Sequence, residues 1–106
     1  MNILFVCSRN QWRSPTAEAI YKRQSGLHVK SAGTEPSARI KLTAKIIMWA
    51  DIIFVMEKKH KQKMMEKFPF ETEGKQIIIL DIPDEYQFMD EELIEDIKAK
   101  VSEYID

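Results

Sequence analysis

The sequence has only one cysteine, Cys7, among its 106 residues. No disulfide can form within the chain, so a disulfide framework and a relay between paired thiols are both excluded. A structural zinc site usually depends on pairs of thiolates. One cysteine and two histidines, His28 and His60, do not supply that ligand set, and we expect no structural metal site.

Long apolar segments are also missing. The longest unbroken apolar runs have five residues, whereas a membrane-spanning helix needs about 20. The first such run has no basic residue before it and is too short for the apolar part of a secretory signal. We therefore expect a cytoplasmic protein with no membrane partner.

Net charge is small, but the charged residues are unevenly distributed. The chain has 16 basic and 17 acidic side chains, a formal charge of −1. Residues 1–67 hold 13 basic and 5 acidic side chains, and residues 68–106 hold 3 and 12. This asymmetry indicates either an anionic partner near the first part of the chain or attraction between the two parts.

The densest basic cluster, at residues 58–63, surrounds His60. Such a run is typical of a solvated helix face, on which we expect His60 to be exposed. A nucleic-acid site would need interleaved aromatic residues or a known module, and neither is present. We therefore expect no nucleic-acid partner.

Short apolar clusters alternate with helical patterns from end to end. Strands are predicted at 3–6, 29–32, 52–56 and 77–80, with the more polar 29–32 at a sheet edge. Helices are predicted at 14–25, with Ser14 as N-cap, at 38–49 and 57–67, and from Asp90 onward. Met64, Met65 and Phe68 should face inward. The order predicts a single α/β domain over residues 1–106: a four-stranded parallel sheet with helices on both faces, a flavodoxin-like three-layer sandwich.

Functional crevices of such sheets lie beyond the carboxyl ends of the strands, and the loop at residues 7–14 follows the first strand directly. Its backbone N–H groups can form an anion-binding nest above a helix N-terminus. The same positive field stabilises a thiolate at Cys7, to which Ser14 can donate a hydrogen bond. Arg13 offers a planar fork for two phosphate oxygens. The alternative is a small buried cysteine at a strand end and a surface arginine.

The stretch VCSRNQWRSPTAE resembles the phosphate-binding loop of the low-molecular-weight protein tyrosine phosphatases, written C-x-G-N-x-C-R-S-P-x-A-E. Further similarity lies at residues 31–34, 50–60 and 82–86, so that the resemblance extends over one phosphatase-like domain. It implies that Cys7 is the nucleophile, Arg13 binds the phosphoryl group, Ser14 steadies the thiolate and Asn10 shapes the loop. The remaining loop residues are then expected to bind substrate: Ser8, Arg9, Gln11 and Trp12. The implied reaction needs no metal or other cofactor.

Three departures accompany the resemblance. Arg9 replaces the family's loop glycine, and Trp12 replaces its second cysteine, so a protective disulfide cannot form. The chain is also shorter than typical members, mainly after Thr34, where the family has a long loop that walls the phosphotyrosine site. The shortening affects the expected phosphotyrosine preference more than the phosphate chemistry.

A leaving oxygen needs a proton donor, and carboxylates follow the fourth predicted strand. Asp84 matches the aspartate of the family's D-P-[YW] motif and is the candidate general acid, with Asp81 as second choice. A solvated turn carboxylate is the alternative for both. Tyr86 is a candidate for stacking on an aromatic substrate, or for packing beneath the loop.

These features predict a cysteine-dependent phosphatase that acts on a phosphomonoester, such as protein phosphotyrosine, through a phosphocysteine intermediate. One alternative is a catalytically degenerate protein that binds phosphate or a phosphopeptide. The other is an arsenate reductase, which would need an external thiol because the chain has only Cys7. A binding protein needs neither Cys7 nor Asp84, so their joint presence favours the enzyme. A phosphorylated protein or small molecule is the expected partner.

Overall fold

Strands and helices alternate along the computed structural model, which describes residues 1–105. The strands are β1 (Asn2–Cys7), β2 (His28–Gly33), β3 (Ile52–Val55) and β4 (Gln76–Ile79). The helices are α1 (Arg13–Tyr21), α2 (Ala44–Trp49), α3 (Lys58–Lys67), α4 (Pro69–Thr72) and α5 (Glu91–Val101). The predicted order is confirmed, and α4 is an additional short helix after α3.

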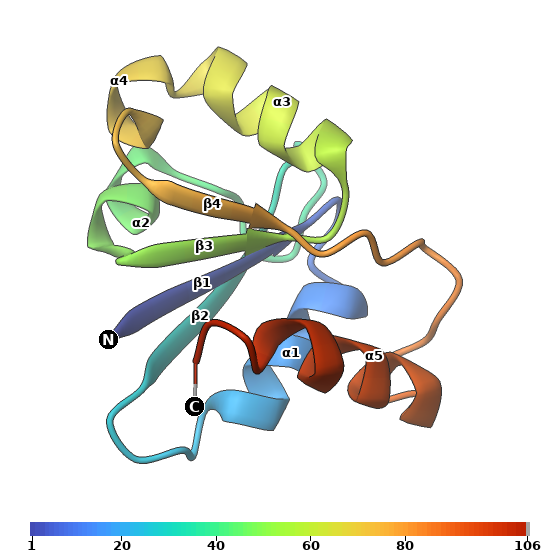
Figure 1. The fold of residues 1–106 in the computed structure, drawn as a ribbon. Coiled ribbons are helices and arrows are strands. Elements are labelled where there is room, and N and C mark those ends of the chain that lie inside the picture. Colours follow the sequence, from blue (N-terminus) through green and yellow to red (C-terminus); the bar gives the residue numbers. More distant parts are fainter. Residues whose placement is uncertain (106) are drawn as a thin grey trace.

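The four strands form one parallel sheet in the order β2-β1-β3-β4. Ile3 of β1 is in register with Val29 of β2 and Ile52 of β3. The more polar β2 lies at an edge, as expected. Because all four strands run in the same direction, the loops that follow them meet at one edge of the sheet (Figure 1).

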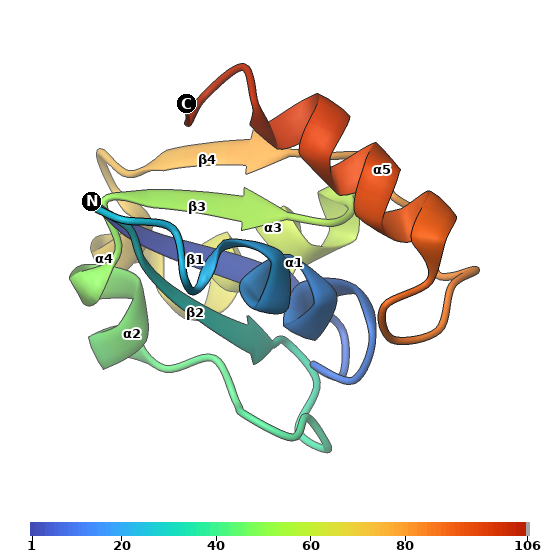
Figure 2. The same cartoon turned by 90° about the horizontal axis from the view of Figure 1, so that it is seen from below.

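Successive side chains of β1 enter two separate apolar cores, as the pleat of a strand requires. Ile3 and Phe5 belong to the first core, together with residues of α1 and α5. Leu4 and Val6 belong to the second, together with residues of α2 and α3. Figures 1 and 2 show α1 and α5 on one face of the sheet and α3 and α4 on the other. The prediction of helices on both faces is therefore confirmed.

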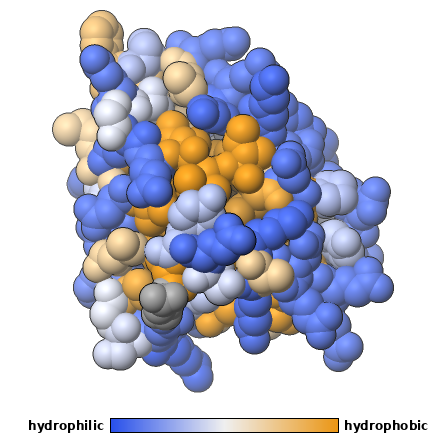
Figure 3. Space-filling model, in the orientation of Figure 1, coloured by the Kyte–Doolittle hydropathy of each residue, from blue (hydrophilic) through white to orange (hydrophobic). Residues whose placement is uncertain are grey.

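The outer strand β4 leaves part of its apolar surface uncovered. Ile77 and Ile79 pack against the second core and Ile78 against the first, but all three are only partly buried. Figure 3 shows apolar side chains gathered over this strand, between the two helical layers. None of the helices within residues 1–105 is long and apolar enough to cross a membrane.

The start of α1 differs from the prediction. The helix begins at Arg13, and Trp12 takes the N-cap position without a side-chain hydrogen bond. Ser14 is therefore not the cap, and its hydroxyl lies 2.9 Å from the sulfur of Cys7 instead.

Two further helices also differ from their predicted form. The helix α2 is shorter, because residues 34–42 form backbone hydrogen bonds with β2 and with the loop after β1. In α3, Met64 is buried and Phe68 packs against the second core as expected, but Met65 is exposed.

Candidate active site

The Cys7 loop, residues 7–14, joins β1 to α1 at the carboxyl edge of the sheet. Cys7 is almost completely buried at the end of the central strand. Its sulfur lies 2.9 Å from the hydroxyl oxygen of Ser14 and accepts a hydrogen bond of 3.3 Å from the backbone N–H of Asn10. Two polar groups thus meet this sulfur, which an inert apolar thiol would not require.

Asn10 shapes the turn of this loop and ties it to β2. Its φ angle of 55° is left-handed, a conformation that asparagine adopts more readily than most residues. The buried side-chain amide donates hydrogen bonds to the hydroxyl oxygens of Ser14, at 2.9 Å, and Ser31, at 2.8 Å. The curvature of the loop and the position of Ser14 are therefore fixed together.

Arg13 is the first residue of α1, and its guanidinium is buried and held from several sides. One terminal nitrogen, Nη1, donates to Glu57 Oε1 at 2.5 Å and to the carbonyl oxygen of Ile82 at 2.8 Å. The Nε atom lies 3.8 Å from Asp84 Oδ1. Burial acts to raise the pKa of Glu57, but the hydrogen bond and charge of Arg13 outweigh it and lower that pKa. Glu57 therefore stays ionised and orients the guanidinium.

His60 is fully buried, so its predicted exposure is wrong. It lies four residues before buried Met64 in α3, and this spacing puts both side chains on the inward face of the helix. The Nδ1 atom accepts a hydrogen bond of 3.0 Å from the backbone N–H of Glu57. The hydrogen of the neutral ring is therefore on Nε2, which donates to the Ser8 hydroxyl at 2.8 Å.

The charge state of His60 follows from its surroundings. Burial, and after it the positive charge of Arg13, lowers the pKa of His60 to about 4. The ring is therefore neutral near pH 7, as its hydrogen bonds require. Through Glu57 and His60, the start of α3 contacts both ends of the Cys7 loop.

The segment after β2 supports the loop with its backbone. The N–H groups of Thr34, Glu35 and Arg39 donate to the carbonyl oxygens of loop residues 7, 8 and 9, at 2.9–3.0 Å. Gly33 permits this approach. A Cβ atom at this position would lie 2.6 Å from the carbonyl oxygen of Ser8, closer than real Cβ atoms come.

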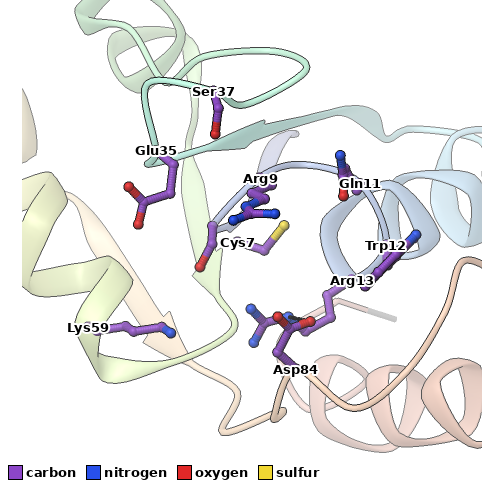
Figure 4. Close-up of a pocket in the computed structure, with 10 residues that line it drawn as sticks. Cys7, Arg9, Gln11, Trp12, Arg13, Glu35, Ser37, Lys59 and Asp84 are labelled. Atoms are coloured by element: carbon purple, nitrogen blue, oxygen red, sulfur yellow. Dashed lines mark ion pairs between the residues drawn. The ribbon is translucent and has the colours of Figure 1, made fainter.

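A cavity of about 410 Å³ opens above the loop (Figure 4). Seven of the residues predicted from the sequence line it: Cys7, Ser8, Arg9, Gln11, Trp12, Arg13 and Asp84. Asn10 and Ser14 are buried behind the loop and act through its shape. Tyr86 does not line the cavity, and its partly buried side chain packs against the first core.

Three further residues line the cavity that were not predicted to belong to the site: Glu35, Ser37, and Lys59 of the basic cluster. Glu35 accepts a hydrogen bond of 2.6 Å from Lys63, and this contact lowers the pKa of Glu35. Lys59 and Glu35 come from different segments and face the cavity from the side opposite Trp12 (Figure 4).

The geometry suits an oxyanion above the sulfur of Cys7, because buried Arg13 and exposed Lys59 both line the cavity. Asp84 reaches the same space from the segment after β4. Asp81, the second candidate acid, does not line it; its carbonyl oxygen accepts a hydrogen bond from Lys100 at 3.1 Å.

Within residues 1–105, no group of three or more histidine, cysteine, aspartate or glutamate side chains could hold a metal ion.

Comparison with known proteins agrees with this geometry. A family model described as low molecular weight phosphotyrosine protein phosphatase matches residues 2–50, which include the Cys7 loop. A protein-arginine-phosphatase from Geobacillus stearothermophilus is 34% identical over 91 residues, which are 63% of this chain and 62% of that protein. The chain is therefore similar to low molecular weight phosphatases, most directly over residues 2–50. The aligned part spans less than two thirds of this curated relative.

Solved structures of phosphatases share the fold of this chain. The YwlE arginine phosphatase from Geobacillus stearothermophilus is 27% identical, with a TM-score of 0.67 over 96% of this chain and 84% of that one. The tyrosine phosphatase Wzb from Escherichia coli K30, in complex with phosphate, has a TM-score of 0.76 at 21% identity. That match covers 97% of this chain and 94% of Wzb, and it shows a common fold.

The two substitutions in the family's loop pattern are accommodated differently. Arg9, at the glycine position, does not have a positive φ angle; the left-handed residue of the loop is its neighbour Asn10. The loop therefore forms without backbone strain at Arg9. Trp12, at the position of the second cysteine, is 42% exposed and extends away from the sulfur of Cys7 (Figure 4).

Proposed function

We propose that this protein is a cysteine-dependent phosphatase that hydrolyses a phosphomonoester through a phosphocysteine intermediate. The observation that carries the proposal is the common cavity of Cys7, Arg13 and Asp84, which come from three distant parts of the chain. The hydrogen bonds of Ser14 and Asn10 to the sulfur are the kind that stabilise a thiolate. The substrate would be a phosphorylated protein or small molecule, and the cytoplasm is the expected location.

The reaction would proceed in two displacements at phosphorus. The thiolate of Cys7 attacks and forms an S–P bond, while the bond from phosphorus to the leaving oxygen breaks and Asp84 protonates that oxygen. Arg13 and the loop N–H groups hold the remaining phosphoryl oxygens. Water then attacks phosphorus and gives its proton to Asp84. The S–P bond breaks, phosphate leaves and the thiolate is restored.

A phosphoarginine side chain is a second candidate substrate, for which the arginine phosphatase relatives give a precedent by name. The observation that favours it is the carboxylate of Asp84, which is 56% exposed at the cavity and 3.8 Å from its nearest ion-pair partner, Arg13. The leaving group of phosphoarginine is a guanidine, which becomes a cation on protonation. An exposed carboxylate could both supply that proton and bind the resulting guanidinium.

The nucleophile is tested by the Cys7→Ser variant. It should lose turnover of p-nitrophenyl phosphate and of peptides that carry phosphotyrosine or phosphoarginine. Phosphate should still bind, because the loop N–H groups and Arg13 remain. In the wild type, mass spectrometry after an acid quench should find one phosphoryl group on Cys7. Turnover by Cys7→Ser would contradict the covalent mechanism.

The general acid is tested by Asp84→Asn, with Asp81→Asn as the matched control. Asp84→Asn should lower kcat about 10²–10⁴-fold for alkyl phosphates and far less for p-nitrophenyl phosphate, whose leaving group hardly needs a proton. Asp81→Asn should leave both rates unchanged, because Asp81 does not line the cavity. The reverse pattern would make Asp81 the acid.

The two other functions predicted from the sequence have distinct signatures. A wild type that binds phosphate but hydrolyses none of these substrates would be a degenerate binding protein. An arsenate reductase would reduce arsenate in the presence of an external thiol faster than it hydrolyses any phosphate compound.

A further inference from the structure

A second groove, of about 490 Å³, lies beside the catalytic cavity along α1. Trp12 and Gln11 line both the groove and the cavity, so the two spaces adjoin each other at these residues. Phe88, 76 residues further along the chain than Trp12, also lines the groove. The proposed mechanism does not use this space.

Two aromatic side chains in the groove are exposed to solvent. Trp12 is 42% exposed and Phe88 is 53% exposed. Large apolar side chains gathered at an exposed groove are typical of binding sites, and aromatic residues frequently provide most of the binding energy. In Figure 4 Trp12 extends away from Cys7, in agreement with its place at the border between the cavity and the groove.

The segment that carries Phe88 is held in place against α1. The backbone N–H of Met89 donates to the hydroxyl of Thr16 at 2.9 Å, and the N–H of Asp90 donates to the carbonyl of Gln87 at 3.2 Å. Met89 has a φ angle of 63°, which is unusual for a residue other than glycine. The tight turn therefore presents Phe88 at a defined place rather than on a loose loop.

Charged residues line the groove together with the two aromatic side chains. Glu18, Lys22 and Arg39 line the same groove. Arg39 also donates from Nε to the carbonyl oxygen of Asn10 at 3.1 Å, which connects the groove to the Cys7 loop. A combination of aromatic and charged side chains is typical of sites that bind peptides.

We propose that this groove binds an apolar side chain next to the phosphorylated residue of a polypeptide substrate. The proposal rests on the phosphatase function proposed above. It is based on the shared lining of the two spaces: a peptide with its phosphoryl group above Cys7 would have to pass Trp12, which borders the groove that Phe88 also lines. A small phosphorylated metabolite would occupy the catalytic cavity and leave the groove empty. The groove thus favours a protein substrate over a metabolite.

The test uses alanine peptides with one phosphorylated residue. In each peptide a single phenylalanine is placed at one of four positions, the two before and the two after the phosphorylated residue. One set carries phosphotyrosine and the other phosphoarginine. For the set that the enzyme hydrolyses, one position should raise kcat/KM about tenfold, the effect expected from partial burial of one apolar side chain. Phe88→Ala should remove this preference without changing hydrolysis of p-nitrophenyl phosphate.

Phe70→Ala is the matched control, because Phe70 is 84% exposed on α4 and does not line the groove. It should keep the tenfold preference. The proposal is overturned if no position raises kcat/KM, or if Phe88→Ala keeps the preference. It is also overturned if sedimentation shows a dimer that Phe88→Ala dissociates, because a second copy of the chain would then occupy the groove.

Failure of the catalytic proposal gives a different result. If the wild type hydrolyses neither p-nitrophenyl phosphate nor any peptide, the phosphatase function is wrong. Calorimetry with the same peptides then tests the groove alone. Binding about tenfold tighter at one position, lost in Phe88→Ala, would support the groove, and equal binding of all peptides would overturn it.

Discussion

Lowering the pH from 7 to 5 should destabilise this protein through His60. The pKa of its ring is about 4 in the folded protein and 6.5 as the ordinary value, mainly because the ring is buried. The charges of Arg13, Lys59 and Lys63 lower this pKa further, and Glu57 acts in the opposite direction. The unfolded chain therefore binds the proton more tightly than the folded one. Stability is fully present above about pH 6.5 and is lost as the pH falls toward 4.

The size of the effect follows from these two pKa values. At about 1.4 kcal/mol per pH unit, the whole difference is about 3 kcal/mol, reached below pH 4. At pH 5 about 2 kcal/mol should already be lost, because most unfolded chains are then protonated at this residue while the folded ring is still largely neutral. For a chain of this size, such a loss lowers Tm by about 8 °C.

Thermal unfolding followed by circular dichroism at pH 7 and pH 5, at constant ionic strength, measures this loss. His60→Asn should start from a lower Tm at pH 7, because it loses buried contacts, but its Tm should change little between the two pH values. His28→Gln is the matched control; His28 is exposed on β2, and the variant should keep the full decrease. If His60→Asn loses as much stability as the wild type, the buried neutral histidine is not the cause.

Three further predictions concern the loop and its supports. Gly33→Ala should lower the free energy of unfolding by about 1–3 kcal/mol and reduce activity, because the new Cβ meets the Cys7 loop. Gly26→Ala, at φ 84° in open space, should lower it by about 1 kcal/mol and leave activity intact. Unfolding and turnover measurements on the two variants test this difference. Ser31→Ala should lower the free energy of unfolding by about 1–2 kcal/mol, since Asn10 loses a buried hydrogen-bond partner. The same variant should bind phosphate more weakly in calorimetry. Peroxide should inactivate the enzyme at Cys7, with protection by vanadate, because the chain has no second thiol to trap a sulfenic acid; intact-mass spectra without preferential oxidation of Cys7 would contradict this.

The sheet and the Cys7 loop could be predicted because each depends on short-range patterns. Continuous apolar runs such as residues 3–6 are typical of strands covered on both faces, and all four predicted strands are present. The Cys-to-Arg spacing and its place after a strand identified the cavity. The limits of α2 could not be predicted, because its apparent helical pattern continues back to Ala38. Tertiary backbone hydrogen bonds between residues 34–42 and their neighbours override that pattern.

The roles of Glu57 and His60 were missed for a different reason. Both lie in or beside a lysine-rich stretch, which by composition indicates a solvated surface. Two signals were present in the sequence. His60 is four residues before Met64, whose inward position was predicted, and Glu57 follows closely after an apolar strand at the functional edge of the sheet. The contact between Glu57 and Arg13 joins residues 44 positions apart, and no local pattern reveals such a pairing.

The backbone hydrogen bonds from residues 34, 35 and 39 to the Cys7 loop have a consequence for how this scaffold can diverge. Main-chain bonds depend on the path of the chain and hardly on which side chains it carries. Substitutions at Glu35 and Ser37, which line the cavity, can therefore accumulate without moving Cys7. Gly33 is the position least open to substitution among the three glycines, because only there would an added Cβ meet the Cys7 loop. Substrate preference and reaction chemistry can thus evolve separately in the same small fold.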